Sequence, residues 1–177
     1  ITSGNWTVIT CTYSDVETFA NLATCSLLIN STITNAGGAH FFYDQNQHRF
    51  FMKNNAGTIF PSGGILPGSA SVIESENAIL DCAASSITSS GNTITISWRV
   101  KLKSPMTNRT CNLYMTAKDD VGAYISWTSN GQLNVIGNSA PSLGALTPNA
   151  GAITIGAWNT VTNVYSDPDG YENLANC

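Results

Sequence analysis

Charged side chains are scarce in this sequence. Lysine, arginine, aspartate and glutamate make up 10% of its 177 residues, and the net charge is −4, whereas a globular domain ordinarily has about 25% charged residues. Such a weakly acidic chain lacks the basic character of a nucleic-acid-binding protein, so we expect no nucleic-acid partner. Its polar surface must come from serine, threonine, asparagine and glycine, which is typical of secreted β-proteins.

Sequence motifs of enzymatic chemistry are absent as well. The chain has no GxSxG elbow, no HExxH motif and no phosphate-binding glycine loop. Its two histidines, His40 and His48, flank one predicted hairpin, across which they could meet, but two imidazoles alone make a poor metal site. We therefore expect that the protein is not an enzyme and that it needs no cofactor, with calcium, considered below, as the one candidate.

Long hydrophobic runs and helical periodicity are missing too. No apolar stretch is long enough to span a bilayer, and no signal peptide is recognisable. We therefore expect no membrane span, and a soluble segment that lies outside the cell or on its surface.

The sequence does contain a series of short β-strand patterns. The clearest is 94–102, where Ile94, Ile96, Trp98, Val100 and Leu102 alternate with polar residues. Further strands are predicted at 6–13, 25–29, 39–43, 49–53, 78–82, 111–117, 123–128 and 133–136, with a loop at 61–71 and at most one helical turn within 16–23. This set predicts an all-β protein, an antiparallel immunoglobulin-like β-sandwich.

The last 25 residues of the chain repeat the first 25. At a constant offset of 152, segments 1–25 and 153–177 are identical at 12 of 25 positions. A gapless copy at a fixed offset is the signature of a tandem array. We therefore predict a β-sandwich repeat at 1–138. Residues 139–177 are predicted to hold a linker, an edge strand at 142–151 and the opening of the next repeat, or a strand donated to a neighbouring subunit.

Five cysteines fall at wide and irregular spacing, without the CxxC pairs of a zinc site. We interpret them as disulfide partners in an oxidising compartment. The tail copy keeps Cys25 as Cys177 but has Asn163 in place of Cys11, which indicates that Cys11 and Cys25 belong to different bridges. The predicted bridges are Cys25–Cys82 and Cys11–Cys111, with Cys177 left for an inter-module bridge. A free buried thiol is the alternative for any one of them.

Three asparagines begin N-x-S/T sequons and are candidate N-glycosylation sites: Asn5, Asn30 and Asn108. In a chain this rich in asparagine and threonine, three matches are close to background.

Several short motifs resemble a widespread module of large bacterial surface proteins. They are YSDPDGYENL at 165–174, LLIN at 27–30, LPGSA at 66–70, ILDC at 79–82 and KDDVG at 118–122. The modules of that family are immunoglobulin-like or cadherin-like β-sandwiches strung in tandem, mostly without an assigned activity. The resemblance covers nearly the whole chain. It implies a structural or adhesive role outside the cell, and it does not imply a ligand.

The same resemblance implies candidate calcium ligands near the junction between modules. Asp167, Asp169 and Glu172 of the DPDG turn, and the pair Asp119 and Asp120, are the carboxylates concerned. Calcium takes six to eight oxygen ligands. The alternative is that these residues build turns without any ion.

Two functions stay open on this evidence. The first is an extracellular structural protein whose modules join neighbouring copies or adjacent repeats in a surface filament, stalk or sheath, through disulfides and strand exchange. The second is a carbohydrate-binding or adhesion module of a larger surface protein.

Two sequence features bear on the glycan-binding alternative. A basic stripe of Arg99, Lys101 and Lys103 would contact acidic glycans or simply be a solvated strand face. The aromatic residues of 41–43 and 50–51 would form a sugar platform or pack in the core.

Overall fold

The computed structural model describes residues 1–171 and 174–177. The chain divides into two compact units, Ile1–Gly137 and Asn138–Cys177. This division lies one residue before the boundary expected from the sequence repeat.

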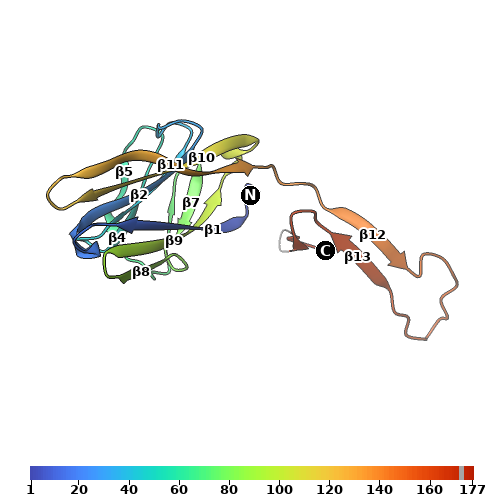
Figure 1. The fold of residues 1–177 in the computed structure, drawn as a ribbon. Coiled ribbons are helices and arrows are strands. Elements are labelled where there is room, and N and C mark those ends of the chain that lie inside the picture. Colours follow the sequence, from blue (N-terminus) through green and yellow to red (C-terminus); the bar gives the residue numbers. More distant parts are fainter. Residues whose placement is uncertain (172–173) are drawn as a thin grey trace. The chain divides into compact units, whose positions relative to one another are not determined.

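The first unit consists of two antiparallel sheets (Figure 1). One sheet has the strand order β1-β9-β7-β6, with β8 also paired to β9; the other has the order β11-β10-β2-β3-β4-β5. The first sheet is built from β1 (Trp6–Ser14), β6 (Val72–Glu74), β7 (Ala78–Asp81), β8 (Ser86–Ser90) and β9 (Thr93–Leu102). The second is built from β2 (Leu22–Asn30), β3 (Ala39–Asp44), β4 (Arg49–Lys53), β5 (Ile59–Ile65), β10 (Arg109–Asp119) and β11 (Tyr124–Val135). The predicted all-β sandwich is confirmed.

The core lies between the two sheets. Strand β9 alternates buried and partly exposed residues along its whole length, as its period-two sequence predicts. Trp98 of β9 is fully buried, and its ring centroid lies 6.1 Å from that of Phe41 in β3 and 5.3 Å from that of Phe50 in β4. Aromatic residues of the predicted hairpin therefore join the sheets from the inside.

Helical structure in the described residues is restricted to two single turns of 3-10 helix, η1 (Phe19–Asn21) and η2 (Ser104–Met106). The first lies inside the segment for which the sequence predicts no more than one turn. The hydroxyl of Thr18 caps it by accepting a hydrogen bond from the amide of Ala20.

The prediction of a loop at 61–71 is wrong over its first part, because β5 continues through Pro61 to Ile65. Proline cannot donate to a sheet ladder, but β5 is the edge strand beside β4, so no partner there requires its amide. The left-handed Gly64, with φ of +61°, follows in the same strand. A Cβ at this position would lie 2.5 Å from the ring of Phe51, so only glycine fits.

The strand predicted as two pieces near 123–136 is a single strand, β11, paired with β10. The register between β10 and β11 shifts twice, after Asn112 and after Met115. Each shift is a β-bulge, and with these two bulges β11 stays paired with β10 on both sides of the polar stretch around Asn130.

The second unit contains one hairpin, of β12 (Ser142–Thr147) and β13 (Thr162–Ser166). The predicted edge strand is therefore present but four residues shorter than 142–151. Strand β13 is the sequence copy of the last five residues of β1, Thr10 to Ser14.

Candidate functional site

Strand β1 lies at the end of its sheet. Its partner in the described structure is β9, and its other edge faces the gap towards β10 and β11. A cavity of about 240 Å³ opens there, lined by Tyr13, Met115, Ala117 and Ile125 among others. A second cavity of about 230 Å³ continues it past Leu22. This groove, between the edge of β1 and the strands β10 and β11, is called the β1 groove below.

The tail copy of the β1 segment lacks the surroundings that β1 has in the first unit. In the first unit, Trp6 is half-buried beneath two cations of β9, Arg99 at 5.2 Å and Lys101 at 4.7 Å from its ring centroid. Trp158, its counterpart in the tail, is fully exposed. The tail therefore presents the opening of a sandwich but, in the described residues, no counterpart of β9 within the same unit.

The cysteines do not form the predicted bridges. All five are unpaired, with Cys11, Cys25, Cys82 and Cys111 buried and Cys177 exposed. The predicted Cys11–Cys111 bridge is wrong for a geometric reason. Cys25 of β2 lies opposite Ala117 of β10 in the sheet. Cys111 is six residues from Ala117 along β10, so Cys25 and Cys111 are roughly 20 Å apart at about 3.3 Å per residue. Cys11 lies at the Cys25 end of the sandwich, since Tyr13, two residues away, bonds to the carbonyl of Ser26 next to Cys25, so Cys111 is beyond the reach of a disulfide.

Cys11 and Cys25 lie close together, which contradicts the expectation that they belong to separate bridges. Burial, and then the neighbouring Cys11, raise the pKa of Cys25 to about 12. Burial also raises the pKa of Cys11 and, together with Asp81, raises that of Cys82 to about 11. These thiols are protonated at neutral pH and poorly nucleophilic as long as the sandwich stays folded.

The described candidate calcium ligands accept hydrogen bonds, Asp119 and Asp167 within their own turns and Asp120 and Asp169 from residues distant in the chain. A carboxylate oxygen of Asp119 accepts hydrogen bonds from the amides of Val121 and Ala123, at 3.1 and 2.7 Å. Asp120 accepts from the side chain of Asn46 at 2.6 Å. In the second unit, Asp167 accepts from the amide of Asp169 at 2.8 Å, and Asp169 accepts from the amide of Ser139.

These carboxylates do not gather. Glu172 lies outside the described residues, and no group of three or more metal-binding side chains is present among the residues that are described. Asp119 and Asp167 bond as the turn-building alternative predicts, whereas Asp120 and Asp169 are bonded to distant residues.

The three sequons differ in accessibility. Asn108 is exposed in a turn with φ of +58°, and Asn5 is half-buried beside the start of β1. Asn30 is only 1% exposed, and its side-chain amide donates to the carbonyl of Thr34 while its oxygen accepts from Arg109. The folded chain has no room for a glycan on Asn30, whose side chain holds the following loop instead.

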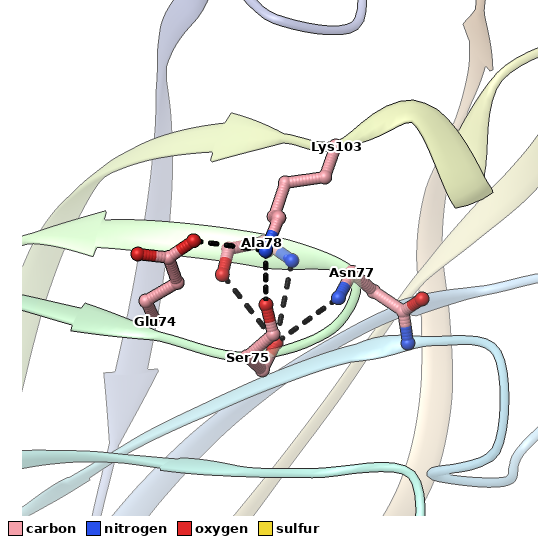
Figure 2. A network of polar contacts seen from close by, with 5 residues as sticks. All are labelled: Glu74, Ser75, Asn77, Ala78 and Lys103. Atoms are coloured by element: carbon pink, nitrogen blue, oxygen red, sulfur yellow. Dashed lines mark hydrogen bonds and ion pairs between the residues drawn. The ribbon is translucent and has the colours of Figure 1, made fainter.

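The cations of the basic stripe, two on β9 and one just after it, contact neighbouring residues of their own sheet. Arg99 pairs with Asp81 at 3.4 Å. Figure 2 shows Lys103 at the end of the stripe, where its ammonium group donates to the carboxylate of Glu74 at 2.9 Å and to the carbonyl of Ser75 at 2.8 Å. The stripe stabilises contacts within its own sheet, so the solvated alternative is closer to the structure than an anion-binding surface.

The histidines lie at opposite ends of the β3–β4 hairpin and do not meet across it. His40 pairs with Lys53 at one end of the β3–β4 hairpin, whereas His48 lies in the turn at the other end and accepts or donates a 2.6 Å hydrogen bond with the hydroxyl of Tyr43. His40 is buried, and burial followed by Lys53 lowers its pKa to about 3.

Sequence reasoning missed an aromatic cavity on the outer face of the second sheet. It measures about 280 Å³ and is lined by His40, Phe42, Lys53 and Trp127 among others. The rings of His40 and Trp127 meet edge to face, 5.2 Å apart. Phe42 comes from the predicted aromatic hairpin, but Trp127 comes from β11, and no sequence pattern links the two strands.

Comparison with protein-family models, with curated proteins and with solved structures finds no match to this chain. None of the described helices is of a length and hydrophobicity that would let it cross a membrane.

Proposed function

We propose that this chain is an extracellular structural module that joins neighbouring copies of itself, or adjacent repeats, in a cell-surface filament, stalk or sheath. The observation that carries the proposal is the second copy of the β1 sequence in the tail, where the described residues of its own unit include no counterpart of β9, the strand that β1 pairs with.

The exposed side chains of the tail support the proposal. Leu143, Ile153, Ile155, Trp158 and Val164 are all largely exposed. This concentration of exposed large apolar side chains within 143–164 favours a segment that binds another protein. The sparse charge, the lack of catalytic motifs and the resemblance to tandem modules of bacterial surface proteins agree with a mechanical role.

The test is the assembly state of the 177-residue chain. Sedimentation velocity over a range of concentrations is expected to show growing species, and electron microscopy to show end-to-end objects. Trp158→Ala removes the largest exposed ring and should weaken association at least tenfold, since burial of such a side chain contributes about 1.5–3 kcal/mol.

The matched control is Val121→Ala, which changes an equally exposed apolar residue in the β10–β11 turn and should leave assembly unchanged. A chain that stays monomeric at the highest soluble concentration contradicts the proposal.

The aromatic outer cavity favours one second candidate, a carbohydrate-binding role. Trp127, Phe42 and His40 offer ring surfaces, and Lys53 and Thr116 offer hydrogen-bond donors beside them, a combination that suits a sugar. A glycan array probed with the chain tests it. Binding that is lost in Trp127→Ala and kept in Tyr171→Ala, an exposed aromatic residue of the other unit, would establish this role.

A further inference from the structure

We propose that the β1 groove is the acceptor site for strand β12 of a second copy of this chain, which adds antiparallel to β1 in one defined register. The inference rests on the proposed function and names the two surfaces that join. It follows from the hairpin that the tail copy of β1 makes with β12.

The edge of the strand supplies the first argument. The amide of Asp15 bonds to the carbonyl of Asn92 just before β9, so the backbone groups of the odd residues Cys11 and Tyr13 also point to β9. The even residues Thr10, Thr12 and Ser14 therefore point to the free edge.

The tail copy uses that same edge to bind β12. Val164 is the counterpart of Thr12, and its carbonyl oxygen lies 3.2 Å from where a Cβ of Gly144 would be. A carbonyl this close to β12 points towards it, so β12 occupies the edge of β13 that corresponds to the open edge of β1. Gly144 also leaves space for a β-branched neighbour, which is Val164 in the hairpin and Thr12 in β1.

The register supplies the second argument. In the hairpin, Ser142 pairs with Ser166, Leu143 with Tyr165, Leu146 with Asn163 and Thr147 with Thr162. Moved by the offset of 152, Ser142 lies opposite Ser14, Leu143 opposite Tyr13, Leu146 opposite Cys11 and Thr147 opposite Thr10.

Directly opposed residues of an antiparallel pair point to the same face of the sheet. Tyr13 and Cys11 both point into the core of the first unit. The shift of register between Leu143 and Leu146 turns both leucines to this face. They would therefore enter the β1 groove, against Met115, Ala117 and Ile125.

The exposure of Leu143 and Leu146 indicates why β12 would leave its own hairpin for the β1 of a second copy. In their own hairpin Leu143 is 83% and Leu146 is 49% exposed. The β1 groove offers apolar walls from the opposite sheet, which a two-stranded hairpin does not have. Strand β12 thus gains contacts when it exchanges its own β13 for the β1 of a second copy.

A cysteine pair across the predicted register tests the proposal. The hydroxyls of Ser142 and Ser166 lie 2.9 Å apart in the hairpin, and Ser14 is the counterpart of Ser166. One full-length chain carries Ser14→Cys and the other carries Ser142→Cys, both with Cys177→Ser to remove the exposed thiol. The chains are mixed folded and oxidised with glutathione disulfide, and the crosslinked peptides are identified by mass spectrometry.

The expected result is a 14–142 crosslink at least about tenfold more abundant than the 12–142 crosslink from a matched mixture with Thr12→Cys. Thr12 is exposed on the same face of β1, but two residues along the strand carry it beyond the roughly 7 Å Cα separation that a disulfide spans. Adding Leu143→Asp and Leu146→Asp to the donor chain should abolish the 14–142 product.

Other results overturn the inference in distinguishable ways. If the chains assemble in sedimentation but 14–142 is not enriched over 12–142, the joining surfaces are different although the proposed function stands. If a chain with both Ser14→Cys and Ser142→Cys closes only within itself and the mixture gives no crosslink, β12 serves its own molecule. A chain that never associates removes the proposed function and this inference together.

Discussion

The hydroxyl of Tyr13 in β1 donates a 3.0 Å hydrogen bond to the backbone carbonyl of Ser26 in β2, and this bond crosses from one sheet to the other. Both ends are buried, and Cys11 and Cys25 lie on the inner faces of the same two strands. The bond therefore fixes the position of β1, the strand whose free edge forms the β1 groove.

Removal of this bond should lower the stability of the sandwich. Tyr13→Phe keeps the ring but leaves the carbonyl of Ser26 without this donor, at an expected cost of about 1–2 kcal/mol in the free energy of unfolding. Urea denaturation measures it. Tyr124→Phe, in which the lost hydroxyl is on an exposed ring, should change stability by less than about 0.5 kcal/mol. Equal effects of the two substitutions would contradict the assignment.

The turn between β6 and β7 depends on one hydroxyl. The side-chain oxygen of Ser75 accepts hydrogen bonds from the amides of Asn77 and Ala78, at 3.3 and 3.2 Å, and all three residues are buried (Figure 2). Ser75→Ala leaves both amides without this acceptor and should cost about 1–3 kcal/mol. Ser71→Ala, at an exposed serine just before β6, serves as the control in the same denaturation experiment. A neutral Ser75→Ala would show that the turn forms without the hydroxyl.

His40 should make the fold sensitive to mild acid. Its pKa is about 3 in the folded chain and about 6.5 when unfolded, so the unfolded state binds the proton first. The stabilisation is complete above pH 6.5 and is lost as the pH falls towards 3. At pH 5 the loss should be about 2 kcal/mol, at roughly 1.4 kcal/mol per pH unit.

His40→Asn should remove this part of the pH dependence, as measured by urea midpoints at pH 7.5 and pH 5. His48→Asn, at an exposed position whose positive φ asparagine tolerates, should retain it. An unchanged pH dependence in His40→Asn would assign the acid sensitivity to other groups.

Oxidation should join Cys11 to Cys25 and not to Cys111. When the chain is refolded with glutathione disulfide as the oxidant, non-reducing peptide mapping is expected to find an 11–25 bridge, because Cys11 and Cys25 lie on facing strands at the same end of the sandwich, whereas Cys111 lies six residues along β10 from the residue opposite Cys25. Cys11→Ser should remove this bridge, and Cys111→Ser should leave it in place. An 11–111 bridge in the refolded chain would contradict the register of β10 and β2.

Thiol labelling of the reduced, folded chain gives an independent check on the same cysteines. Cys177 should react at once, and the four buried cysteines should react only as fast as the sandwich opens.

Some elements followed directly from local patterns. The alternation along β9 predicts both a strand and the residues that it buries, because side chains of a strand point to opposite faces in turn. The hairpin of β3 and β4 was predicted from its aromatic residues and the polar turn between the two strands. Strand β5 was not, because proline and glycine usually interrupt strands, and only its place at the sheet edge makes them acceptable.

The candidate site, too, could be predicted from the sequence only in part. The copied tail was evident from the sequence, but the β1 groove and the outer aromatic cavity are formed by strands far apart in the chain. Trp127 of β11 meets His40 of β3 across the two strands β10 and β2 that lie between them in the sheet. Cysteine pairing was misjudged for a related reason: spacing along the chain says nothing about which ends of two strands meet.

The sequence by itself determined that this protein is built of β-strands and that its tail repeats its head. The strands follow from local periodicity, and the repeat follows from the identity of residues at a constant offset. Only the tertiary structure decided which edge of β1 stays open, which thiols are neighbours and which carboxylates are already engaged in turns. These depend on sheet order and register, which arise from contacts between distant segments and leave no local pattern in the chain.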